Sequence, residues 1–448
     1  CEWDNLQGTE ETMINVRLAA YNAFSAVVRK GGYSNLVLAQ SLTPDMTQSQ
    51  KGFTTALVYG TLDKLYNVDY IISCFARGRL KPVIQDILRL SVYQLIYMNV
   101  PDYTVCDEAV LLTVRTGKQA LKGYVNGVLR NIARNKENIV YPDVQKEPEK
   151  YLSVKYSWPI FLVREAIKDL GFTKAEAALS YNAVPMNSVK ANPLLCGDER
   201  LFELLKEKGA EPRRGTLQSD VIYIKGNAAL GEKLFENGFY SVQSEPSAMV
   251  CRAVDPQPGE SILDCCAAPG GKTVCMAEII GDGSITACEY HKHRCDLIFA
   301  NAQRCKVRDK VKIINADMTQ PQKELGLYDR VLVDAPCSGL GVVGSKPDVK
   351  LTLTPEKLKE IRQVQKKILD NCCNYVKPGG VLVYSTCTIR PEENSKQVNN
   401  FLSKHPEFTI DNINAPEAVK TREGFIQLLP WRDGVYGFFI ARMRRADI

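Results

Sequence analysis

The segment Val331-Leu332-Val333-Asp334-Ala335-Pro336-Cys337-Ser338-Gly339 begins as a short apolar run rich in β-branched residues, which predicts a buried strand. It ends in an acid, a proline and a thiol. Strands of parallel sheets present ligand-binding groups at their carboxyl ends, so this end is a candidate site. The alternative is a Pro/Gly loop with an inert buried cysteine. A second apolar strand, residues 381–388, weakens that alternative because Cys387 lies at its tip.

Strands and helices alternate along the chain on both sides of this segment, from residue 241 onward. The expected strands are 261–266, 284–289, 311–317, 328–334 and 381–388, and the expected helices are 271–280, 291–303, 355–376 and 392–404. A turn at Asp433-Gly434 predicts a closing antiparallel pair of strands, 425–429 and 437–443. This alternation is typical of a doubly wound α/β sheet, so residues 241–448 are predicted to form a Rossmann-like domain.

The front of the chain shows helical periodicity instead. Helices are expected at residues 15–30, 53–66, 82–98, 108–114 and 122–134, with Thr104-Val105-Cys106-Asp107 as a capping box. Residues 13–140 hold 15 Lys and Arg against 8 Asp and Glu, whereas the whole chain has a net charge of +6. A basic, all-α domain suits a polyanion such as nucleic acid, although a solvated basic face explains the charge equally well.

A polar linker with two prolines leads into a smaller mixed α/β domain, residues 150–240. Helices are expected at 158–170, 174–181 and 199–208, and strands at 188–192 and 221–225. Arg213-Arg214 could touch a nucleic-acid backbone, but we favour a solvated loop there. With 448 residues, three domains of this kind are a reasonable total.

Composition indicates a folded soluble protein, with 45% hydrophobic and 24% charged residues and no apolar run near the roughly 18 residues that span a bilayer. The first 30 residues do not have the order of a signal peptide. Met13 opens the first expected helix, so residues 1–12 are interpreted as an upstream extension. We expect a cytoplasmic monomer.

The cysteines favour reduced thiols in the cytoplasm, because their number, 15, is odd and most lie inside apolar runs. His291-Lys292-His293-Arg294-Cys295 is the nearest approach to a metal-ligand pattern. It lies on a charged helical face with no second ligand cluster nearby, so we expect no metal.

A glycine-containing turn, Asp264-Cys265-Cys266-Ala267-Ala268-Pro269-Gly270-Gly271-Lys272-Thr273, joins the first of these strands to its helix. A phosphate loop would need glycine where Cys266 stands, and the dinucleotide spacing G-x-G-x-x-G is absent. A nucleoside ligand remains. Glu289, 19 residues after Gly270, is placed to accept ribose hydroxyls, and Asp317 ends the following strand. S-adenosylmethionine fits all these positions.

The two thiols then have a chemical task. Carbon 5 of cytosine is too weak a nucleophile to take a methyl group directly, but addition of a thiolate to carbon 6 makes carbon 5 enamine-like. A base must later remove the carbon-5 proton so that the thiol can leave. A free thiol has a pKa of about 8.5, so the site must favour the thiolate. Asp334 can bond the N3/N4 edge of the ring and stabilise the adduct.

Asp334-Ala335-Pro336-Cys337-Ser338-Gly339, Ser385-Thr386-Cys387-Thr388 and the turn 267–273 together resemble the RNA 5-methylcytosine methyltransferases. The front domain resembles the NusB-like RNA-binding domain through Gly123-Tyr124-Val125-Asn126-Gly127-Val128-Leu129-Arg130. The resemblance implies that Cys387 is the nucleophile and that Cys337 assists product release. It also implies an S-adenosylmethionine site lined by Cys266, Ala267, Ala268, Pro269, Gly270, Gly271, Lys272, Glu289, Asp317 and Asp334. The domain order is that of the 16S rRNA enzymes, which implies cytosine 967 as the target.

Two segments depart from the family pattern. Gln243-Ser244-Glu245 stands where Gln-Asp-Glu is usual, and Gly344-Ser345-Lys346-Pro347-Asp348 stands where Arg-Arg-His-Pro-Asp is usual. The second change puts a phosphate contact in doubt unless Lys346 and Lys350 compensate. The mechanism also has an alternative, because DNA cytosine methyltransferases use the Pro-Cys thiol, here Cys337, as nucleophile. Other open alternatives are a different rRNA or tRNA target and a non-catalytic RNA-binding assembly factor.

Overall fold

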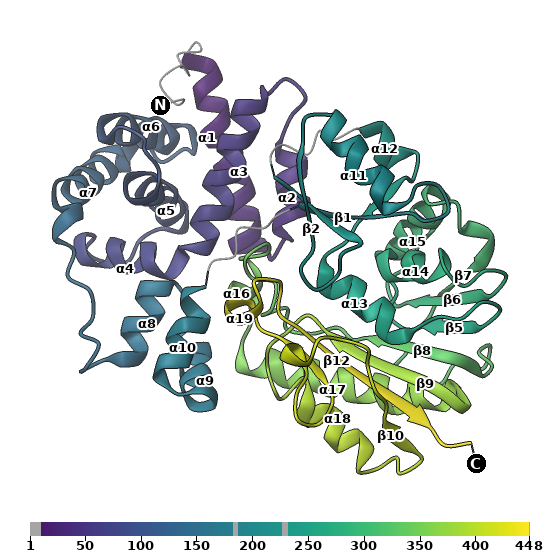
Figure 1. Cartoon of the computed structure of the whole chain (residues 1–448). Coiled ribbons are helices and arrows are strands. Elements are labelled where there is room, and N and C mark those ends of the chain that lie inside the picture. The colour runs from purple at the N-terminus through teal and green to yellow at the C-terminus, as the bar shows by residue number, and fades with distance from the viewer. Residues whose placement is uncertain (1–9, 182–186, 226–231, 448) are drawn as a thin grey trace. The chain divides into compact units, whose positions relative to one another are not determined.

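The computed structural model describes residues 10–181, 187–225 and 232–447. Contacts divide the chain into two compact units (Figure 1). Unit 1 contains the chain up to Tyr181 together with a short later segment, residues 346–353. Unit 2 contains residues 182–345 and 354–448. The short segment therefore lies within the later part of the sequence but packs with the front of the chain.

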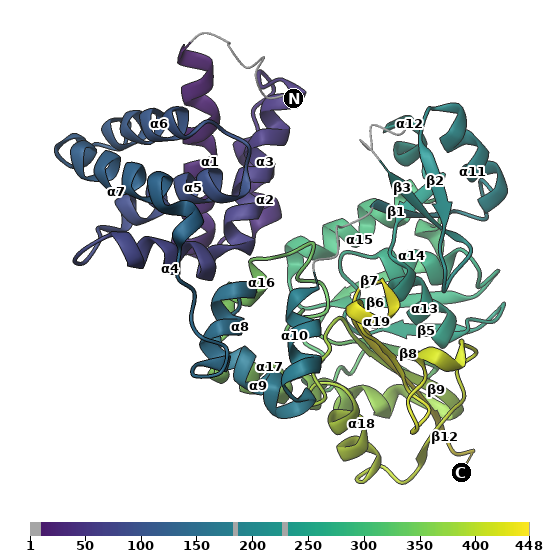
Figure 2. The same cartoon turned by 60° about the vertical axis from the view of Figure 1, so that its left-hand side comes forward.

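Unit 1 is all helical, as the sequence predicted. α1 packs beside α3, and α6 packs beside α7 (Figures 1 and 2). Side chains such as Phe24, Leu57 and Ile87 are fully buried between the helices. Its α-helices are α1 (Glu10–Lys30), α2 (Ser34–Ser41), α3 (Gln48–Asp63), α4 (Leu65–Phe75), α5 (Pro82–Tyr97), α6 (Asp102–Arg115), α7 (Lys122–Asn135), α8 (Pro148–Tyr156), α9 (Ile160–Leu170), α10 (Phe172–Ser180) and α16 (Val349–Thr352).

The capping box lies at a different helix from the one predicted. Thr47 caps α3: its hydroxyl oxygen accepts from the Gln50 backbone N–H at 3.2 Å, and the Gln50 side chain accepts from the Thr47 N–H at 2.8 Å. The prediction at Thr104 is wrong because α6 already begins at Asp102, directly after Pro101. An acid in the first turn favours this earlier start through the helix dipole. Met13 likewise lies inside α1, whose first residue is Glu10; residues 1–9 lie outside the described part.

Helices α8 to α10 pack with the bundle, whereas the sequence suggested a new domain from residue 150. Asn67 donates from its side chain to the Val154 carbonyl at 3.1 Å, and the Ser157 hydroxyl accepts from the Tyr66 N–H at 3.0 Å. Ser157 ends α8 in a left-handed conformation. Hydrogen bonds that tie α8 to α4 therefore place these helices in unit 1.

Unit 2 opens with a small antiparallel sheet in the order β2-β3-β1-β4. Its elements are β1 (Asn187–Ala191), α11 (Asp198–Glu207), β2 (Glu211–Arg214), β3 (Val221–Lys225), α12 (Glu232–Glu236) and β4 (Tyr240–Val242). Arg213 and Arg214, expected in a loop, lie on β2. The Arg214 guanidinium pairs with Asp198 at 2.8 Å and Glu199 at 2.7 Å. These carboxylates neutralise Arg214, which argues against a phosphate contact there.

The eight-stranded sheet of unit 2 has the order β10-β12-β9-β8-β5-β6-β7, with β11 paired to β12. Strands β5 to β9 run parallel, and β10, β11 and β12 pair antiparallel. The doubly wound prediction is confirmed. The strands are β5 (Ser261–Asp264), β6 (Ser284–Glu289), β7 (Val311–Asn315), β8 (Tyr328–Asp334), β9 (Val376–Thr386), β10 (Phe408–Ile410), β11 (Ile426–Leu428) and β12 (Phe438–Arg445).

Helices cover both faces of this sheet because its strands are apolar on both sides. Leu332 packs with α13, α14 and α15 on one face, while its neighbours Val331 and Val333 pack with α17 and α18 on the other. The helices are α13 (Glu245–Val254), α14 (Gly271–Ala277), α15 (Lys292–Arg304), α17 (Pro355–Cys372), α18 (Ser395–Leu402) and the short α19 (Pro430–Asp433).

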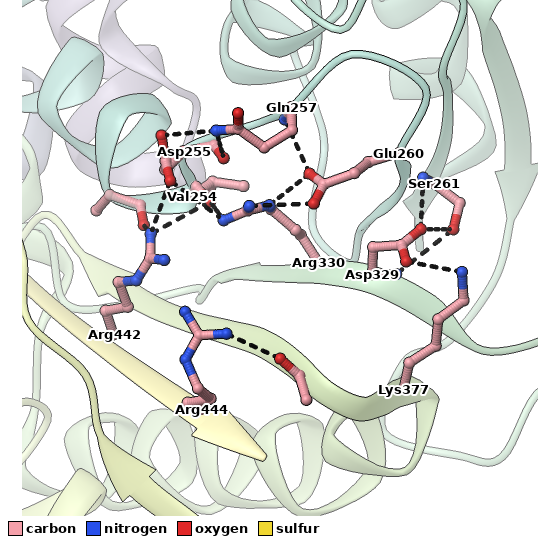
Figure 3. Close-up of polar contacts among 12 residues, drawn as sticks. Val254, Asp255, Gln257, Glu260, Ser261, Asp329, Arg330, Lys377, Arg442 and Arg444 are labelled. Carbon is pink, nitrogen blue, oxygen red and sulfur yellow. Dashed lines mark hydrogen bonds and ion pairs between the residues drawn. The ribbon is translucent and has the colours of Figure 1, made fainter. Parts of the chain in front are cut away.

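A polar network closes the amino ends of the central strands (Figure 3). Arg330, only 8% exposed, holds Glu260 through two contacts of 2.5 and 3.1 Å and donates to the Val254 carbonyl at 2.7 Å. Asp329 accepts from the Ser261 backbone N–H at 2.8 Å and pairs with Lys377. These contacts pin β5, β8 and β9 at one end and leave their carboxyl ends for a site.

Over the described ranges, no helix is both long enough and apolar enough to cross a membrane. The cysteines that the structure describes are all free thiols. Within the same residues, no cluster of three or more His, Cys, Asp or Glu side chains could hold a metal ion.

Candidate active site

The carboxyl ends of β5 to β9 border a cleft of about 550 Å³. Both thiols singled out in the sequence line it, together with acids from three different strand ends. The predicted residues on its wall are Cys266, Ala268, Glu289, Asp317, Asp334, Cys337 and Cys387. These side chains lie together because the carboxyl ends of the parallel strands meet at one edge of the sheet.

The two cysteines are in direct contact, with Sγ atoms 3.2 Å apart. The hydrogen bond with Cys387 and burial raise the pKa of the Cys337 thiol well above its ordinary value. The loops that carry the thiols are also joined to each other: the Ser338 and Thr388 hydroxyls are 2.8 Å apart, and the Gly341 N–H donates to the Cys387 carbonyl at 3.0 Å. A small electrophilic ring placed here would meet both sulfurs.

Asp334 lies beside the thiols and is held on both oxygens. Lys272 donates to Oδ2 at 2.6 Å, and the Ser385 hydroxyl donates to Oδ1 at 2.7 Å. Burial alone would lower the pKa of Lys272, but the Asp334 carboxylate reverses the effect and the net shift is upward, with a smaller contribution from Cys387. The ammonium group therefore keeps its charge next to the carboxylate and within electrostatic reach of Cys387.

The turn after β5 is shaped by Gly270 and Asp264. Gly270 has a φ of +104°, and a Cβ there would lie 3.1 Å from the Ile298 Cα, so only glycine fits without strain. Asp264 is 1% exposed and accepts from the Thr273 hydroxyl at 2.7 Å through Oδ2. Burial raises its pKa to about 6. Its buried Oδ1 has no hydrogen-bond partner among the described residues.

Not every residue of this turn reaches the cleft. Cys266 and Ala268 line it, whereas the other predicted members are outside its lining: Ala267, Pro269, Gly270, Gly271 and Lys272. Lys272 acts on the cleft through Asp334 instead. The turn thus borders the cleft mainly through Cys266 and Ala268.

The two further acids are fixed by their own loops. Glu289 Oε1 accepts from the His291 N–H at 2.9 Å. Asp317 Oδ1 accepts from the Thr319 N–H at 2.9 Å and the Thr319 hydroxyl at 2.7 Å. Carboxylates at successive strand ends suit the hydroxyl and amino donors of a nucleoside. This set fits S-adenosylmethionine.

Several residues that line the cleft were not predicted from the sequence as site residues. Tyr290, His291, Met318 and Thr319 directly follow or closely follow the predicted acids, so the strand-tip argument could have included them. Helix α17 contributes three residues at helical spacing but with no motif. The lining residues not predicted as site residues are Cys265, Tyr290, His291, Arg294, Ala316, Met318, Thr319, Ala335, Pro336, Val364, Lys367 and Ile368.

One of the two departures from the family pattern, Ser244, has a structural explanation, and nothing in the structure explains Gly344-Ser345. Ser244 caps α13 by accepting from the Ser247 N–H at 3.4 Å, a role that the usual Asp would fill equally well. The expectation that Lys350 contacts phosphate is contradicted. It is 1% exposed, donates to the Asp63 carboxylate at 2.9 Å and lies over the Trp158 ring. Lys346 is exposed.

A family model described as 16S rRNA methyltransferase RsmB/F matches residues 251–444, and the NusB family model matches residues 14–134. The "Probable ribosomal RNA small subunit methyltransferase B" of Bacillus subtilis (strain 168) is 35% identical, over 96% of this chain and 99% of its own length. Ribosomal RNA small subunit methyltransferase B of Cronobacter sakazakii is 29% identical, over 96% and 98% of the two chains.

Solved structures share the fold. The crystal structure of PH0851 matches with a TM-score of 0.81 and 26% identity, covering 96% of this chain and 99% of its own. NSun6 from Pyrococcus horikoshii matches with a TM-score of 0.59 and 20% identity, over 64% of this chain and 98% of its own. These matches confirm the predicted family and its NusB-like and Rossmann-like parts. The chain belongs to the RsmB/F family of 16S rRNA methyltransferases and is an S-adenosylmethionine-dependent methyltransferase.

Proposed function

We propose that this enzyme methylates carbon 5 of a cytosine in 16S rRNA, cytosine 967, through a covalent cysteine–cytosine adduct. The observation that carries the proposal is the pair of thiols 3.2 Å apart at the ends of two adjacent strands, beside the cofactor cleft. One-step methyl transfer would need no thiol, whereas activation of carbon 5 followed by release gives each of the two a task.

The chain's own residues have separable roles in this reaction. Glu289 would accept the ribose hydroxyls of S-adenosylmethionine, and Asp317 the adenine amino group. The cofactor supplies the methyl group. Asp334, oriented by Lys272 and Ser385, would hold the N3/N4 edge of the cytosine and stabilise charge in the adduct.

We assign the attack to Cys387. The thiolate forms the bond to carbon 6, and the carbon-5 proton must leave after methylation. The raised pKa favours the protonated form of Cys337, and the buried Lys272 ammonium lies within electrostatic reach of Cys387, where it would stabilise negative charge on that sulfur. Once the Cys387 sulfur is bonded to carbon 6, it can no longer carry a charge or share a proton, and the main cause of the Cys337 shift is removed. Cys337 can then lose its proton to solvent and, as a thiolate, take the carbon-5 proton while the C6–S bond breaks.

The domains would divide RNA binding from chemistry. We assign rRNA binding to the basic NusB-like domain, residues 13–140, and to the small mixed part of unit 2 built on the sheet β1 to β4, because α8 to α10 of the expected domain 150–240 pack in unit 1. Catalysis belongs to residues 241–448. The NusB match supports the first assignment. We further propose a cytoplasmic enzyme that acts as a monomer. The free thiols of the described chain agree with a reducing compartment.

Single replacements of the two cysteines test the chemistry. Cys337→Ala, Cys387→Ala and the unmodified enzyme are mixed with 16S rRNA and methyl-labelled cofactor, then separated on a denaturing gel. We expect Cys337→Ala to accumulate a protein–RNA adduct and Cys387→Ala to form none and transfer no methyl group. The reverse pattern would establish the DNA-type mechanism. Undiminished transfer by both variants would refute thiol catalysis, and absence of any transfer by the unmodified enzyme would favour a non-catalytic assembly factor.

Mapping the labelled nucleotide tests the target. Digestion of the product should place 5-methylcytosine at position 967 of 16S rRNA. Label at another rRNA position or in tRNA would be compatible with the same chemistry but would contradict cytosine 967 as the target.

A further inference from the structure

Two fully buried polar side chains hold the backbone on either side of Cys337. The Gln365 amide, from α17, donates at 3.0 Å to the carbonyl of Pro336, the residue before the thiol. Glu393 accepts at 2.8 Å from the N–H of Ser338, the residue after it. Gln365 also donates to the same Glu393 oxygen at 3.0 Å, and both side chains are 0% exposed. The thiol is thus clamped from both sides by one connected pair.

The loop of the other thiol is held by a different residue. Asn394 donates to the Thr388 carbonyl at 3.0 Å and accepts from the Thr386 hydroxyl at 2.6 Å, so it grips both neighbours of Cys387. Consecutive residues, Glu393 and Asn394, therefore serve the two thiols separately. The two loops also share the Ser338–Thr388 and Gly341–Cys387 hydrogen bonds, but Gln365 holds only the Cys337 loop, so its loss leaves the bonds from Asn394 to the Cys387 loop in place.

Folding stability alone is a poor explanation for the Gln365–Glu393 pair. Gln365 Oε1 is buried and accepts no hydrogen bond from the described residues. An unpartnered buried oxygen costs stability, and an aliphatic side chain of similar volume would avoid that cost. A residue that is costly to bury and bonded to the peptide group before a reactive thiol fits a positioning role.

We propose that Gln365 and Glu393 are positioning residues that fix Cys337 for the release half of the reaction. The inference rests on the proposed function, in which Cys337 takes the carbon-5 proton. Loss of the clamp would let the thiol drift from that proton, while Cys387 keeps its own support and still attacks. A displacement near 1 Å is enough to slow a proton transfer by about 100-fold.

The test separates the first methyl transfer from turnover. Gln365→Leu removes the two amide hydrogen bonds at nearly constant volume. Gln397→Leu is the matched control, because Gln397 is also a buried glutamine of this unit and donates to the Arg362 carbonyl at 2.8 Å, between α18 and α17. Each variant is assayed with 16S rRNA for single-turnover transfer, steady-state turnover and adduct on a denaturing gel. Cofactor affinity and thermal unfolding report whether the fold is intact.

For Gln365→Leu we expect turnover to fall at least about tenfold with accumulated adduct, and first-turnover transfer to stay within about twofold. Glu393→Gln should give a smaller adduct signal, since its amide oxygen still accepts from the Ser338 N–H. Gln397→Leu should show no adduct. If Gln365→Leu and Glu393→Gln both match the control, or lose first-turnover transfer and turnover equally, the positioning role is refuted. Cys337→Ala run in parallel identifies the other failure: no adduct there overturns the proposed function itself.

Discussion

Replacing Lys350 by Met should release residues 346–353 from the helical bundle. The Lys350 ammonium is buried and contacts the Asp63 carbonyl at 2.8 Å and carboxylate at 2.9 Å. Removing one partner of a buried ion pair typically costs about 3–5 kcal/mol. Here Asp63 keeps Lys64 at 2.8 Å and is 25% exposed, and burial lowers the pKa of Lys350 despite Asp63. Because Asp63 keeps a partner and the Lys350 charge is already costly to bury, we expect a smaller loss, about 2–3 kcal/mol.

Hydrogen exchange of the segment's backbone amides measures this loss directly. A fall of about 2–3 kcal/mol in the opening free energy speeds exchange roughly 30- to 150-fold. Lys346→Met is the matched control, because Lys346 lies in the same segment but is exposed, and it should leave exchange unchanged. Equal exchange in both variants would refute the docking argument. Unchanged exchange with salt-dependent loss of rRNA affinity in Lys350→Met would restore the phosphate-contact reading.

Three further predictions concern unit 2. Arg330→Leu should lower its unfolding free energy by about 3–5 kcal/mol because Glu260 and a carbonyl lose a buried partner, whereas Lys377→Met, in a more exposed pair, should cost at most about 1 kcal/mol; urea unfolding compares them. The pKa of Asp264 is about 6 in the folded protein and about 3.9 in the unfolded chain, so the protonated carboxyl favours the folded state. Its contribution to the free energy of unfolding is present below pH 4 and is lost as the pH rises through 6. Asp264→Asn should therefore gain about 2–3 kcal/mol relative to the unmodified protein between pH 4 and 7.5, and a pH-independent difference would contradict this. Glu289→Gln should weaken S-adenosylmethionine binding about tenfold or more in calorimetric titration, and unchanged affinity would remove Glu289 from the cofactor site.

The local part of this molecule could be predicted because parallel strands end at a common edge. Glu289, Asp317 and Asp334 lie 28 and 17 residues apart in sequence, yet each ends or follows a strand of one sheet and they share one cleft. Cys337 and Cys387 come together for the same reason, since they lie in the loops that follow the neighbouring parallel strands β8 and β9. The order of the strands and the residue types at their carboxyl ends were enough to predict these site residues.

Contacts between segments far apart in the sequence could not be predicted in this way. Ser34 donates to Asp348 at 2.6 Å across 314 residues of sequence, and no periodicity or motif marks either residue as a partner. Lys350 is of a residue type that binds phosphate, and only its burial against Asp63 shows that it forms an internal ion pair instead. A charged residue read from sequence alone is assigned to solvent by default, since lysines are rarely buried unless paired.

Gln365 shows the same limit inside the site. It stands in a helix rich in Lys, Glu and Gln, next to residues such as Lys366 and Lys367, so its amphipathic pattern marks one face as polar without ranking its members. Lys367 lines the cleft, Lys366 pairs with Asp370, and Gln365 alone of the three points at the Pro336 carbonyl. Which residue of α17 faces the Pro336 carbonyl depends on how the helix packs against β8, and that packing is set by many distant residues together. Positioning residues of this kind are therefore found from hydrogen bonds to the peptide groups beside a reactive atom, and not from sequence motifs.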